Sequence, residues 1–266
     1  MRWNKIKKLL TIAGSDSCGG AGIQADLKTF SAHRVYGMSV ITAVTAQNSQ
    51  GVFAVQDISV DIIQKQIEVI FDDIFVDATK IGMVSKTETI KAIADTLSKY
   101  KINNLVVDPV MVSKSGFHLL QPDAKETLIN HLFPIATVVT PNIPEAEVIT
   151  GLEIQNLNDV EKAAKIIYKM GPKYVLVKGG HMEGEALDVL YDGQKFNYYN
   201  SPRINSKNTH GTGCTLSSAI ASNLGKGLSV TESIEKAKSY ITLAIENSFP
   251  IGKGVGPVHH FYELYK

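Results

Sequence analysis

The chain has 266 residues, of which 44% are hydrophobic and 20% charged, and its formal net charge is +1. This balance excludes a broad basic field for nucleic acid and an acidic solvating tail, so we expect no nucleic-acid partner. The two cysteines, Cys18 and Cys214, make no disulfide framework, and two free thiols in a cytoplasmic protein are the simplest interpretation, although a pairing stays open.

Apolar runs alternate with amphipathic stretches, which is the pattern of βα units around a largely parallel sheet. The first run, Leu9–Ala13, is too short for a signal peptide or a membrane span and favours a buried strand, so we expect no membrane partner. Because no linker, repeat or low-complexity tract interrupts the chain, we expect one α/β domain over residues 1–266. The expected strands are Leu9–Ala13, Val40–Thr45, Leu105–Val107, Thr137–Thr140 and Tyr174–Val177.

Helical periodicity follows several of these runs. Leu216–Leu224 carries apolar residues on one face, and so does Val160–Met170, which ends at the stop signal Gly171-Pro172. Ser85–Glu88 and Ser229–Glu232 have the spacing of capping boxes, in which Ser and Glu satisfy backbone donors at a helix start.

One stretch departs from the alternation of strands and helices. Leu187–Tyr191 and Lys195–Tyr199 flank Asp192-Gly193, a pair that can supply the positive φ of a tight turn. The pattern predicts a hairpin that adds antiparallel strands to one edge of the sheet.

The first glycine-rich segment, Gly14–Gly22, joins the first expected strand to a helical stretch. Its glycines indicate a backbone that bends sharply or approaches a ligand closely. The G-x-G-x-x-G spacing of dinucleotide loops and the Gly-Lys-Ser/Thr ending of a Walker loop are both absent. A plain strand-to-helix turn and a ligand-binding loop both stay open for this segment.

The second glycine-rich segment, Asn208–Thr215, leads directly into a helical stretch. Its glycines therefore lie at a helix N-terminus, where backbone N–H groups lack partners and the dipole favours negative charge. An N-cap made by Thr212 or Thr215 would explain the threonines, but it would not explain the glycines at 211 and 213. We predict a phosphoryl-transfer site at this helix start.

Cys214 lies inside this second segment. A thiol at a helix N-terminus is expected to have a lowered pKa, and its thiolate could then take a proton from a substrate hydroxyl as a general base. The alternative is a small buried apolar residue, which is the commonest role of a free cysteine.

Polar residues also follow three of the expected strands. Asp108 could orient a metal–phosphate complex, or it could cap a turn before Pro109. Lys178 precedes two glycines and could contact phosphate, with a plain turn as the alternative. Lys114 could reach phosphate too, or it could simply be solvated.

Asn142 and Glu145 lie just past the expected strand Thr137–Thr140. With Pro144 between them they suggest a rigid turn that aims polar groups at a hydrated Mg²⁺. Helix initiation explains the same residues, and both interpretations can hold together.

Because these clusters lie at the predicted carboxyl ends of strands, we expect them to meet in a single crevice. A metalloprotein is disfavoured because the histidines lack ligand spacing, and the pair His259-His260 is expected at the surface. A Ser–His–Asp hydrolase is disfavoured because G-x-S-x-G is absent.

Ordered motifs run from the first expected strand to the C-terminal end of the chain. They are Leu10–Asp16, Gly19–Phe30, Thr42–Asn48, Lys80–Met83, Asp108–Met111, Thr140–Glu147, Lys178–His181, Thr209–Thr215 and Gly254–His260. Together they resemble the ribokinase-like superfamily, and closely its hydroxymethylpyrimidine/phosphomethylpyrimidine kinase branch of thiamin biosynthesis. The likeness covers nearly the whole chain, and so many motifs in order make it highly specific.

The resemblance implies a central, mostly parallel sheet flanked by helices, with a few antiparallel edge strands and with ATP and Mg²⁺ as cofactors. It implies phosphorylation of the hydroxymethyl group of 4-amino-5-hydroxymethyl-2-methylpyrimidine, followed by a second phosphorylation that gives the diphosphate. A homodimer is also what the family suggests.

The resemblance carries site residues onto this chain. Cys214 matches the base of this branch, where most of the superfamily carries Asp, and Gly211, Thr212 and Gly213 match the anion hole. The residues that match positions near the nucleotide or its phosphates are Asp108, Asn142, Lys178 and Thr209. Glu145 and Asp108 match positions near the metal. The residues that match the pyrimidine site are Ala21, Asp26, Gln47, Met83 and Val110, with Gln47 able to pair with the ring's amino group and nitrogen.

The chain departs from the branch at Ser113, where Ala is common, and at Cys18, where a small residue or Pro stands. Both departures affect the expected substrate preference more than the fold. A pyridoxal/pyridoxine kinase, or an enzyme with both activities, is the alternative function, because a related branch also carries Cys in the glycine loop and acts on another hydroxymethyl heteroaromatic ring. A non-catalytic binding module is disfavoured because Cys214, Asp108, Glu145 and Lys178 are all present.

Overall fold

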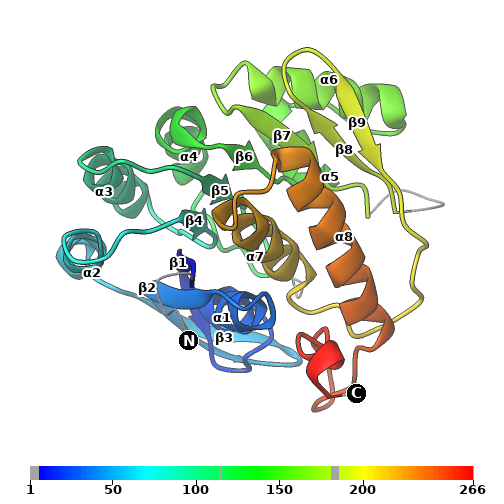
Figure 1. The fold of residues 1–266 in the computed structure, drawn as a ribbon, viewed down its shortest axis with the longest axis horizontal. Coiled ribbons are helices and arrows are strands. Elements are labelled where there is room, and N and C mark those ends of the chain that lie inside the picture. Colours follow the sequence, from blue (N-terminus) through cyan, green and yellow to red (C-terminus); the bar gives the residue numbers. More distant parts are fainter. Residues whose placement is uncertain (1–5, 114–115, 181–185, 266) are drawn as a thin grey trace.

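The computed structural model describes residues 6–113, 116–180 and 186–265, so Lys114 and His181 lie outside the described residues. The described strands form one sheet in the order β3-β2-β1-β4-β5-β6-β7-β8-β9 (Figure 1). Their bounds are β1 Lys8–Asp16, β2 Tyr36–Asn48, β3 Gly51–Asp57, β4 Ala78–Ile81, β5 Leu105–Val107, β6 Val138–Val139, β7 Tyr174–Val177, β8 Asp188–Tyr191 and β9 Phe196–Tyr199.

Six neighbouring strands pair in parallel, namely β2, β1, β4, β5, β6 and β7. The sheet gains antiparallel strands at both edges, β3 on one side and β8 and β9 on the other. The mostly parallel sheet and the β8–β9 hairpin are confirmed; its Gly193 has φ +93° and the side chain of Asp192 accepts from the next turn residues. The second antiparallel edge, β3, and the short strand β4 are additions to the predicted set.

Helices cover both faces of the sheet. They are α1 Gly22–Ala32, α2 Val60–Phe71, α3 Thr87–Ser98, α4 Ala124–His131, α5 Ile143–Thr150, α6 Leu157–Tyr168, α7 Thr212–Gly225 and α8 Val230–Glu246, with short 3₁₀ turns at Phe133–Ile135 and Tyr262–Leu264. Helices α1, α7 and α8 pack on one face, and α2 to α6 pack on the other (Figure 1).

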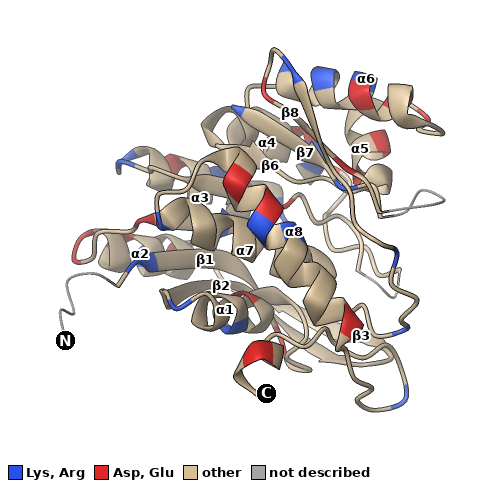
Figure 2. Ribbon diagram, turned by 45° about the vertical axis from the view of Figure 1, so that its right-hand side comes forward, with Lys and Arg blue, Asp and Glu red and all other residues tan. Residues whose placement is uncertain are grey.

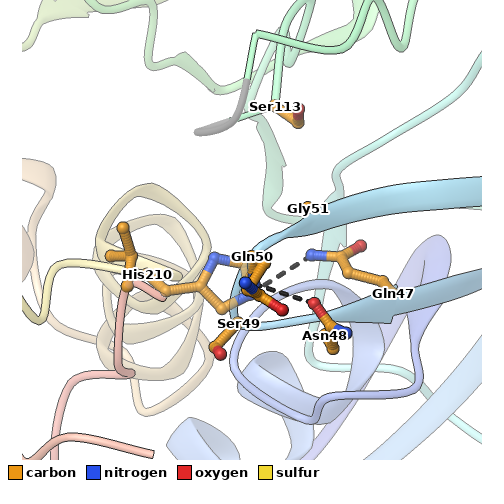
Figure 3. A pocket seen from close by; sticks show the side chains of 8 residues that line it. Gln47, Asn48, Ser49, Gln50, Gly51, Ser113 and His210 are labelled. Atoms are coloured by element: carbon orange, nitrogen blue, oxygen red, sulfur yellow. Dashed lines mark hydrogen bonds between the residues drawn. The ribbon is translucent and has the colours of Figure 1, made fainter. Parts of the chain in front are cut away.

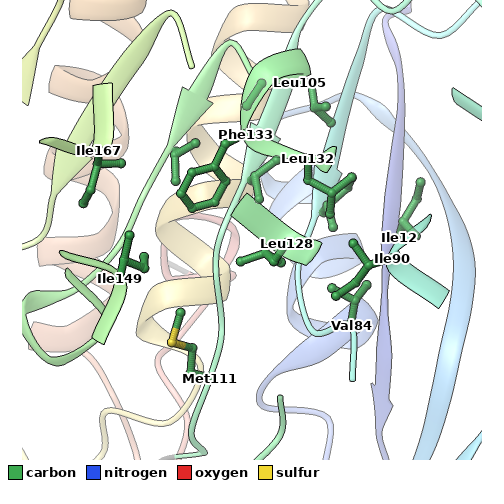
Figure 4. Packing of buried hydrophobic residues seen from close by; sticks show 14 of the residues in the cluster. Ile12, Val84, Ile90, Leu105, Met111, Leu128, Leu132, Phe133, Ile149 and Ile167 are labelled. Carbon is green, nitrogen blue, oxygen red and sulfur yellow. The ribbon is translucent and has the colours of Figure 1, made fainter. Parts of the chain in front are cut away.

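The core is divided between these two faces because side chains alternate along each strand. Ile12 and Leu105 point to the face of α2 to α6, where they meet residues such as Leu128 and Phe133 (Figure 4). Each such side chain is almost fully buried, which stabilises the fold by about 1.5–3 kcal/mol per large residue.

The other face of the sheet changes character along the strands. Under α1, α7 and α8 an apolar set comes first along the strands: Leu9, Ala78, Val106, Val138 and Leu176. Two residues after each of these come polar residues: Thr11, Lys80, Asp108, Thr140 and Lys178. Asp108, Thr140 and Lys178 directly follow the ends of their strands.

The two predicted capping boxes have different outcomes. Ser229 and Glu232 cap each other at the start of α8, as predicted. The prediction at Ser85 is wrong, because α3 begins at Thr87 and Ser85 instead donates to Asp57 across 2.6 Å.

Charged residues of both signs are spread over the helices and loops in Figure 2, while the central strands are mostly uncharged. Among the described residues, no helix combines the length and apolar character that a membrane crossing requires.

Candidate active site

The site lies where the direction of strand succession reverses. Strand β1 pairs with β2 on one side and with β4 on the other, so the loops that leave β1 and β4 diverge at their carboxyl ends. Open α/β sheets bind ligands at such a point. The glycine-rich loop Gly14–Gly22 leaves β1 here, and the start of α7 lies against it.

The two glycine-rich segments are in direct contact. Gly211 has φ +80°, and a Cβ placed on it would overlap the carbonyl oxygen of Gly20. A Cβ on Gly20 would in turn overlap the ring of His210. Both positions therefore need glycine for the close approach of the two loops, and a ligand contact by the first loop stays a prediction.

No side chain caps the first turn of α7, and of its N–H groups that of Thr212 donates to the carbonyl of Thr209 at 3.4 Å. Its N-cap is Gly211, and no side chain accepts a hydrogen bond from that turn. The alternative of a threonine cap is wrong, because Thr212 donates to the carbonyl of Thr209 and Thr215 bonds His260. The N–H groups that open this helix can therefore bind an anion.

Cys214 is the third residue of α7. Its predicted low pKa is wrong: burial raises the pKa of the Cys214 thiol to about 11, against the lowering effect of Lys80 and of the Gly22 N–H. Asp26 and Asp108 raise this pKa further. The dipole of the helix is thus outweighed by desolvation and by two carboxylates.

Asp108 and Lys178 form a buried ion pair, with Nζ 2.7 Å from Oδ1. Thr140 and Ser217 also donate to Asp108, at 3.1 and 3.3 Å. Burial pushes the pKa of Asp108 upward, but Lys178 and Lys80 pull it down more strongly, so the carboxyl stays ionised. A Cβ on Gly213 would lie 3.4 Å from Nζ of Lys178, so this pair lies directly below the glycine loop.

Asn142 and Glu145 close a capping box at the start of α5, so helix initiation is confirmed. Burial raises the pKa of Glu145 to about 7, because Lys178 compensates only part of the desolvation and Asp108 adds to it. A parallel bridge between Asn142 and Lys178 joins this helix start to the ion pair. The residues predicted near phosphate and metal are thus brought together.

The oxygen donors in this region fit a hydrated Mg²⁺, which usually takes one or two carboxylates and keeps several waters. A divalent cation would favour the charged form of Glu145, whose ionisation burial opposes. Within the described ranges, no group of three or more His, Cys, Asp and Glu side chains is arranged to hold a metal.

A small cavity opens beside the first glycine loop. It has a volume of about 90 Å³ and is lined by Gln47, Asn48, Ser49, Gln50, Gly51, Ser113, His210 and Val255 (Figure 3). The amide nitrogen of Gln47 lies 3.3 Å from Nε2 of His210, which lies 2.9 Å from Oδ2 of Asp16. A wider hollow of about 630 Å³ next to it is lined in part by Thr209, Lys207 and Lys253.

The other predicted pyrimidine-site residues have different surroundings. Met83 packs against the first glycine loop, since a Cβ on Gly14 would lie 3.0 Å from its sulfur. Ala21 donates its N–H to Asp16, and Val110 is half-buried just past Asp108; both stay predicted ring contacts. Asp26 requires a correction, because its side chain has no exposed surface that a ring could contact.

The C-terminal segment, defined here as Gly254–His260, also belongs to the site. Val255 donates to the carbonyl of Ser49, and His210 donates to that of Gly256. The expected surface position of His260 is wrong, since it is 6% exposed and bonds Thr215, the residue after Cys214.

Three residues of the site were not predicted individually from the sequence: Asp16, His210 and Lys80. Asp16 and His210 lie inside glycine-rich motifs, where the glycines are the stronger signal. Lys80 is a lysine in an otherwise apolar strand followed by Gly82, and that combination was the available signal.

Comparisons with known proteins agree with this geometry. The family model described as phosphomethylpyrimidine kinase matches residues 16–259. A hydroxymethylpyrimidine/phosphomethylpyrimidine kinase from Rhizobium meliloti (strain 1021) is 52% identical over 261 residues, covering 97% of this chain and 98% of that protein.

Two solved structures share the fold. A phosphomethylpyrimidine kinase from Clostridium difficile 630 is 56% identical with a TM-score of 0.81, covering 90% of this chain and 99% of that one. An ADP complex of Bacillus subtilis pyridoxal kinase is 42% identical with a TM-score of 0.91, covering 98% of this chain and 100% of that one. The predicted ribokinase-like α/β fold is confirmed.

Proposed function

This chain belongs to the phosphomethylpyrimidine kinase family, and from that premise we propose that it phosphorylates 4-amino-5-hydroxymethyl-2-methylpyrimidine and then its monophosphate, with ATP as donor. The observation that supports this best is the meeting of a helix N-terminus without a side-chain cap, an ion pair and a thiol at the carboxyl ends of the strands. Two relatives, from Geobacter sulfurreducens and Arabidopsis thaliana, are named as bifunctional thiamine biosynthesis proteins, which supports thiamin biosynthesis as the setting.

In the proposed reaction the substrate hydroxyl oxygen attacks the γ-phosphorus of ATP. The new O–P bond forms as the bond to the β–γ bridging oxygen breaks, and ADP leaves with that electron pair. The hydroxyl proton passes to the sulfur of Cys214, which must be a thiolate at that moment. The N–H groups at Gly211–Gly213 and the ammonium group of Lys178 would stabilise charge on the transferred group.

Asn142, Glu145 and Asp108 would hold the hydrated Mg²⁺, which when bound neutralises phosphate charge. Thr209 would contribute to the nucleotide side of the site. On the acceptor side, Gln47 would pair with the ring, and Ala21, Met83 and Val110 would contact it; Asp26 would act from behind the site.

A direct test measures ADP formation with hydroxymethylpyrimidine, with its monophosphate and with pyridoxal as separate acceptors. We expect turnover with both pyrimidines, and kcat/KM for pyridoxal at least tenfold lower. Absence of turnover with any acceptor would contradict the kinase proposal, while pyridoxal as the best acceptor would favour the second candidate.

That second candidate is a pyridoxal kinase. It is supported by the 42% identity and the TM-score of 0.91 to the Bacillus subtilis pyridoxal kinase. An enzyme that uses both acceptors is compatible with the same site.

Three further properties stay proposals. The free thiols of Cys18 and Cys214 favour work in the reducing cytoplasm. The single sheet of the described residues supports one domain over residues 1–266. A homodimer rests on the family resemblance.

A further inference from the structure

A second buried ion pair lies beside the first, between Lys80 on β4 and Asp26 on α1. Both side chains are 0% exposed, and Nζ lies 3.0 and 2.9 Å from the two carboxylate oxygens. Thr11 and Ser218 donate to the same carboxylate at 2.6 and 2.7 Å. Asp26 is therefore fully satisfied by its protein partners.

The end of β4 is shaped around this ammonium group. A Cβ on Gly82 would lie 2.6 Å from Nζ of Lys80 and 3.2 Å from Cβ of Ala13, so a side chain there would displace the ammonium group from its present position. Fold stability alone does not call for such a pair, because a buried ion pair can often be replaced by apolar packing without loss. Two residues before Lys80, Ala78 is apolar on the same face of the sheet, and so is its partner Leu9 on β1.

Both helices that hold the Lys80–Asp26 pair also hold the thiol of Cys214. Ser218 lies one turn after Cys214 on the same side of α7 and bonds Asp26. Asp26 in turn lies on α1, whose first residue, Gly22, directs its N–H at the sulfur of Cys214. The pair thus supports the thiol from the two helix starts that enclose it.

The charges around the thiol come from four elements. Lys80 from β4 lowers the pKa of Cys214, whereas Asp26 from α1 and Asp108 from the loop after β5 raise it. Lys178 from the end of β7 also interacts with Cys214, which helps to raise the pKa of this lysine. Without Lys80 a thiolate would face two carboxylates with only Lys178 in compensation.

We infer that Lys80 is a positioning residue for phosphoryl transfer, because its buried ammonium group, fixed by Asp26, makes the thiolate of Cys214 accessible as proton acceptor. The inference rests on the proposed base role of Cys214. It assigns Asp26 a task behind the site in place of a contact with the ring.

The test follows the ionisation of Cys214 without any substrate. Iodoacetamide alkylation of Cys214 is measured by peptide mass spectrometry from pH 6 to 11 in the wild type and in three variants. Lys80→Met should slow alkylation at pH 8.5 at least tenfold, because loss of the ammonium charge leaves a smaller thiolate fraction at that pH. Asp26→Asn should speed it at least threefold, because it removes a carboxylate and leaves the lysine.

The opposite changes in alkylation rate expected for the two variants distinguish an electrostatic effect on the thiol from a purely structural role of the ion pair. If the pair only held the helices together, both variants would loosen the site and change alkylation in the same direction. Ser222→Ala, one turn further along α7, is the matched control and should leave the rate unchanged within twofold. Changes of the same sign, or no change in either variant, would overturn the inference; if Lys80→Met does not fold, Lys80→Gln takes its place in the comparison with Asp26→Asn.

A kinetic readout completes the test. Lys80→Met should lower kcat at least tenfold with KM for ATP changed less than threefold. Its kcat–pH profile should move to higher pH, in the same direction as the pH profile of alkylation. A wild type that phosphorylates no acceptor but shows the opposite shifts would contradict the proposed function and leave the control of the thiol in place.

Discussion

The Nε2 atom of His210 lies 2.9 Å from Oδ2 of Asp16, in a buried contact that joins the segment before α7 to the end of β1. Burial works against the charge of Asp16, but the bonds from His210, Ala21 and Cys18 keep its pKa below the ordinary value. Since the carboxylate can only accept, Nε2 of His210 must carry a hydrogen, which assigns the tautomer.

The amide of Gln47 lies between His210 and Thr45. Its nitrogen is 3.3 Å from Nε2 of His210, and its oxygen accepts from the Thr45 hydroxyl at 3.2 Å. The same hydroxyl lies 3.0 Å from the carbonyl of Ser15. Gln47 therefore shows its nitrogen on the His210 side and its oxygen on the Thr45 side, in a fixed order.

His210→Phe should reduce the discrimination between acceptor rings. A 4-amino ring and its 4-oxo analogue present opposite orders of donor and acceptor, and a fixed amide accepts only one of them. We expect the ratio of kcat/KM for the amino over the oxo ring to fall at least tenfold, with little change in KM for ATP. Steady-state kinetics with both rings checks this, and an unchanged ratio would show that His210 does not fix the orientation of the Gln47 amide.

Replacement of Cys214 tests its role as base. Cys214→Ala should lower kcat by about 10²–10⁴ with KM for either substrate nearly unchanged, because a general base acts in the transition state. An ADP-release assay measures this, and Cys18→Ser, which should keep at least a third of the activity, controls for general thiol loss. Retention of full turnover by Cys214→Ala would remove Cys214 from the mechanism.

Gly227 and Gly211 both have a positive φ, so substitutions at the two positions distinguish the effect of backbone strain from that of a steric collision. Gly227→Ala, at φ +91° with open space around it, should cost about 1 kcal/mol of stability and spare activity. Gly211→Ala adds a collision with the Gly20 carbonyl to similar strain, so we expect a larger loss of stability and activity below a hundredth of wild type. Urea unfolding and turnover check both, and equal effects would argue against contact between the loops.

The pH dependence of stability should carry the signature of Glu145. Burial raises the pKa of Glu145 from its ordinary 4.5 to about 7. Between these values the folded protein holds a proton that the unfolded chain has lost. This contribution is complete below pH 4.5 and is lost as pH rises through 7, and it amounts to as much as about 3 kcal/mol.

Glu145→Gln should flatten this dependence, because glutamine can keep the capping box but carries no charge. Urea unfolding at pH 5 and pH 8 in metal-free buffer measures the two slopes. If the wild type and the variant lose the same stability between these pH values, Glu145 does not ionise with the raised pKa.

The buried strands were predictable where they are continuously apolar, as in β5 and β7, which match the expected bounds. Strand β4 escaped because Thr79 and Lys80 interrupt its apolar pattern, and both are buried only through partners on distant elements. For the same reason the sequence predicted an activated Cys214: it shows the helix dipole but not the depth of burial or the carboxylates that face the thiol.

The residues near phosphate were predicted more completely. Asp108, Asn142, Glu145 and Lys178 each follow a parallel strand, and strand order alone brings such positions to one edge. His210 was harder to recognise, because its partners Asp16 and Gln47 lie 194 and 163 positions away in sequence. Contacts at that range depend on tertiary structure.

The bonds of the C-terminal segment to Ser49 and His210 mean that residues which follow every strand of the described sheet brace the surroundings of Gln47. A product cut short before Gly254 would retain every strand of the sheet, and so could pass for a folded kinase in a spectrum or on a gel filtration column. It would nevertheless lack the hydrogen bonds of Val255 and Gly256 to Ser49 and His210, which lie beside Gln47. Quality control of preparations should therefore read the intact mass as well as the fold.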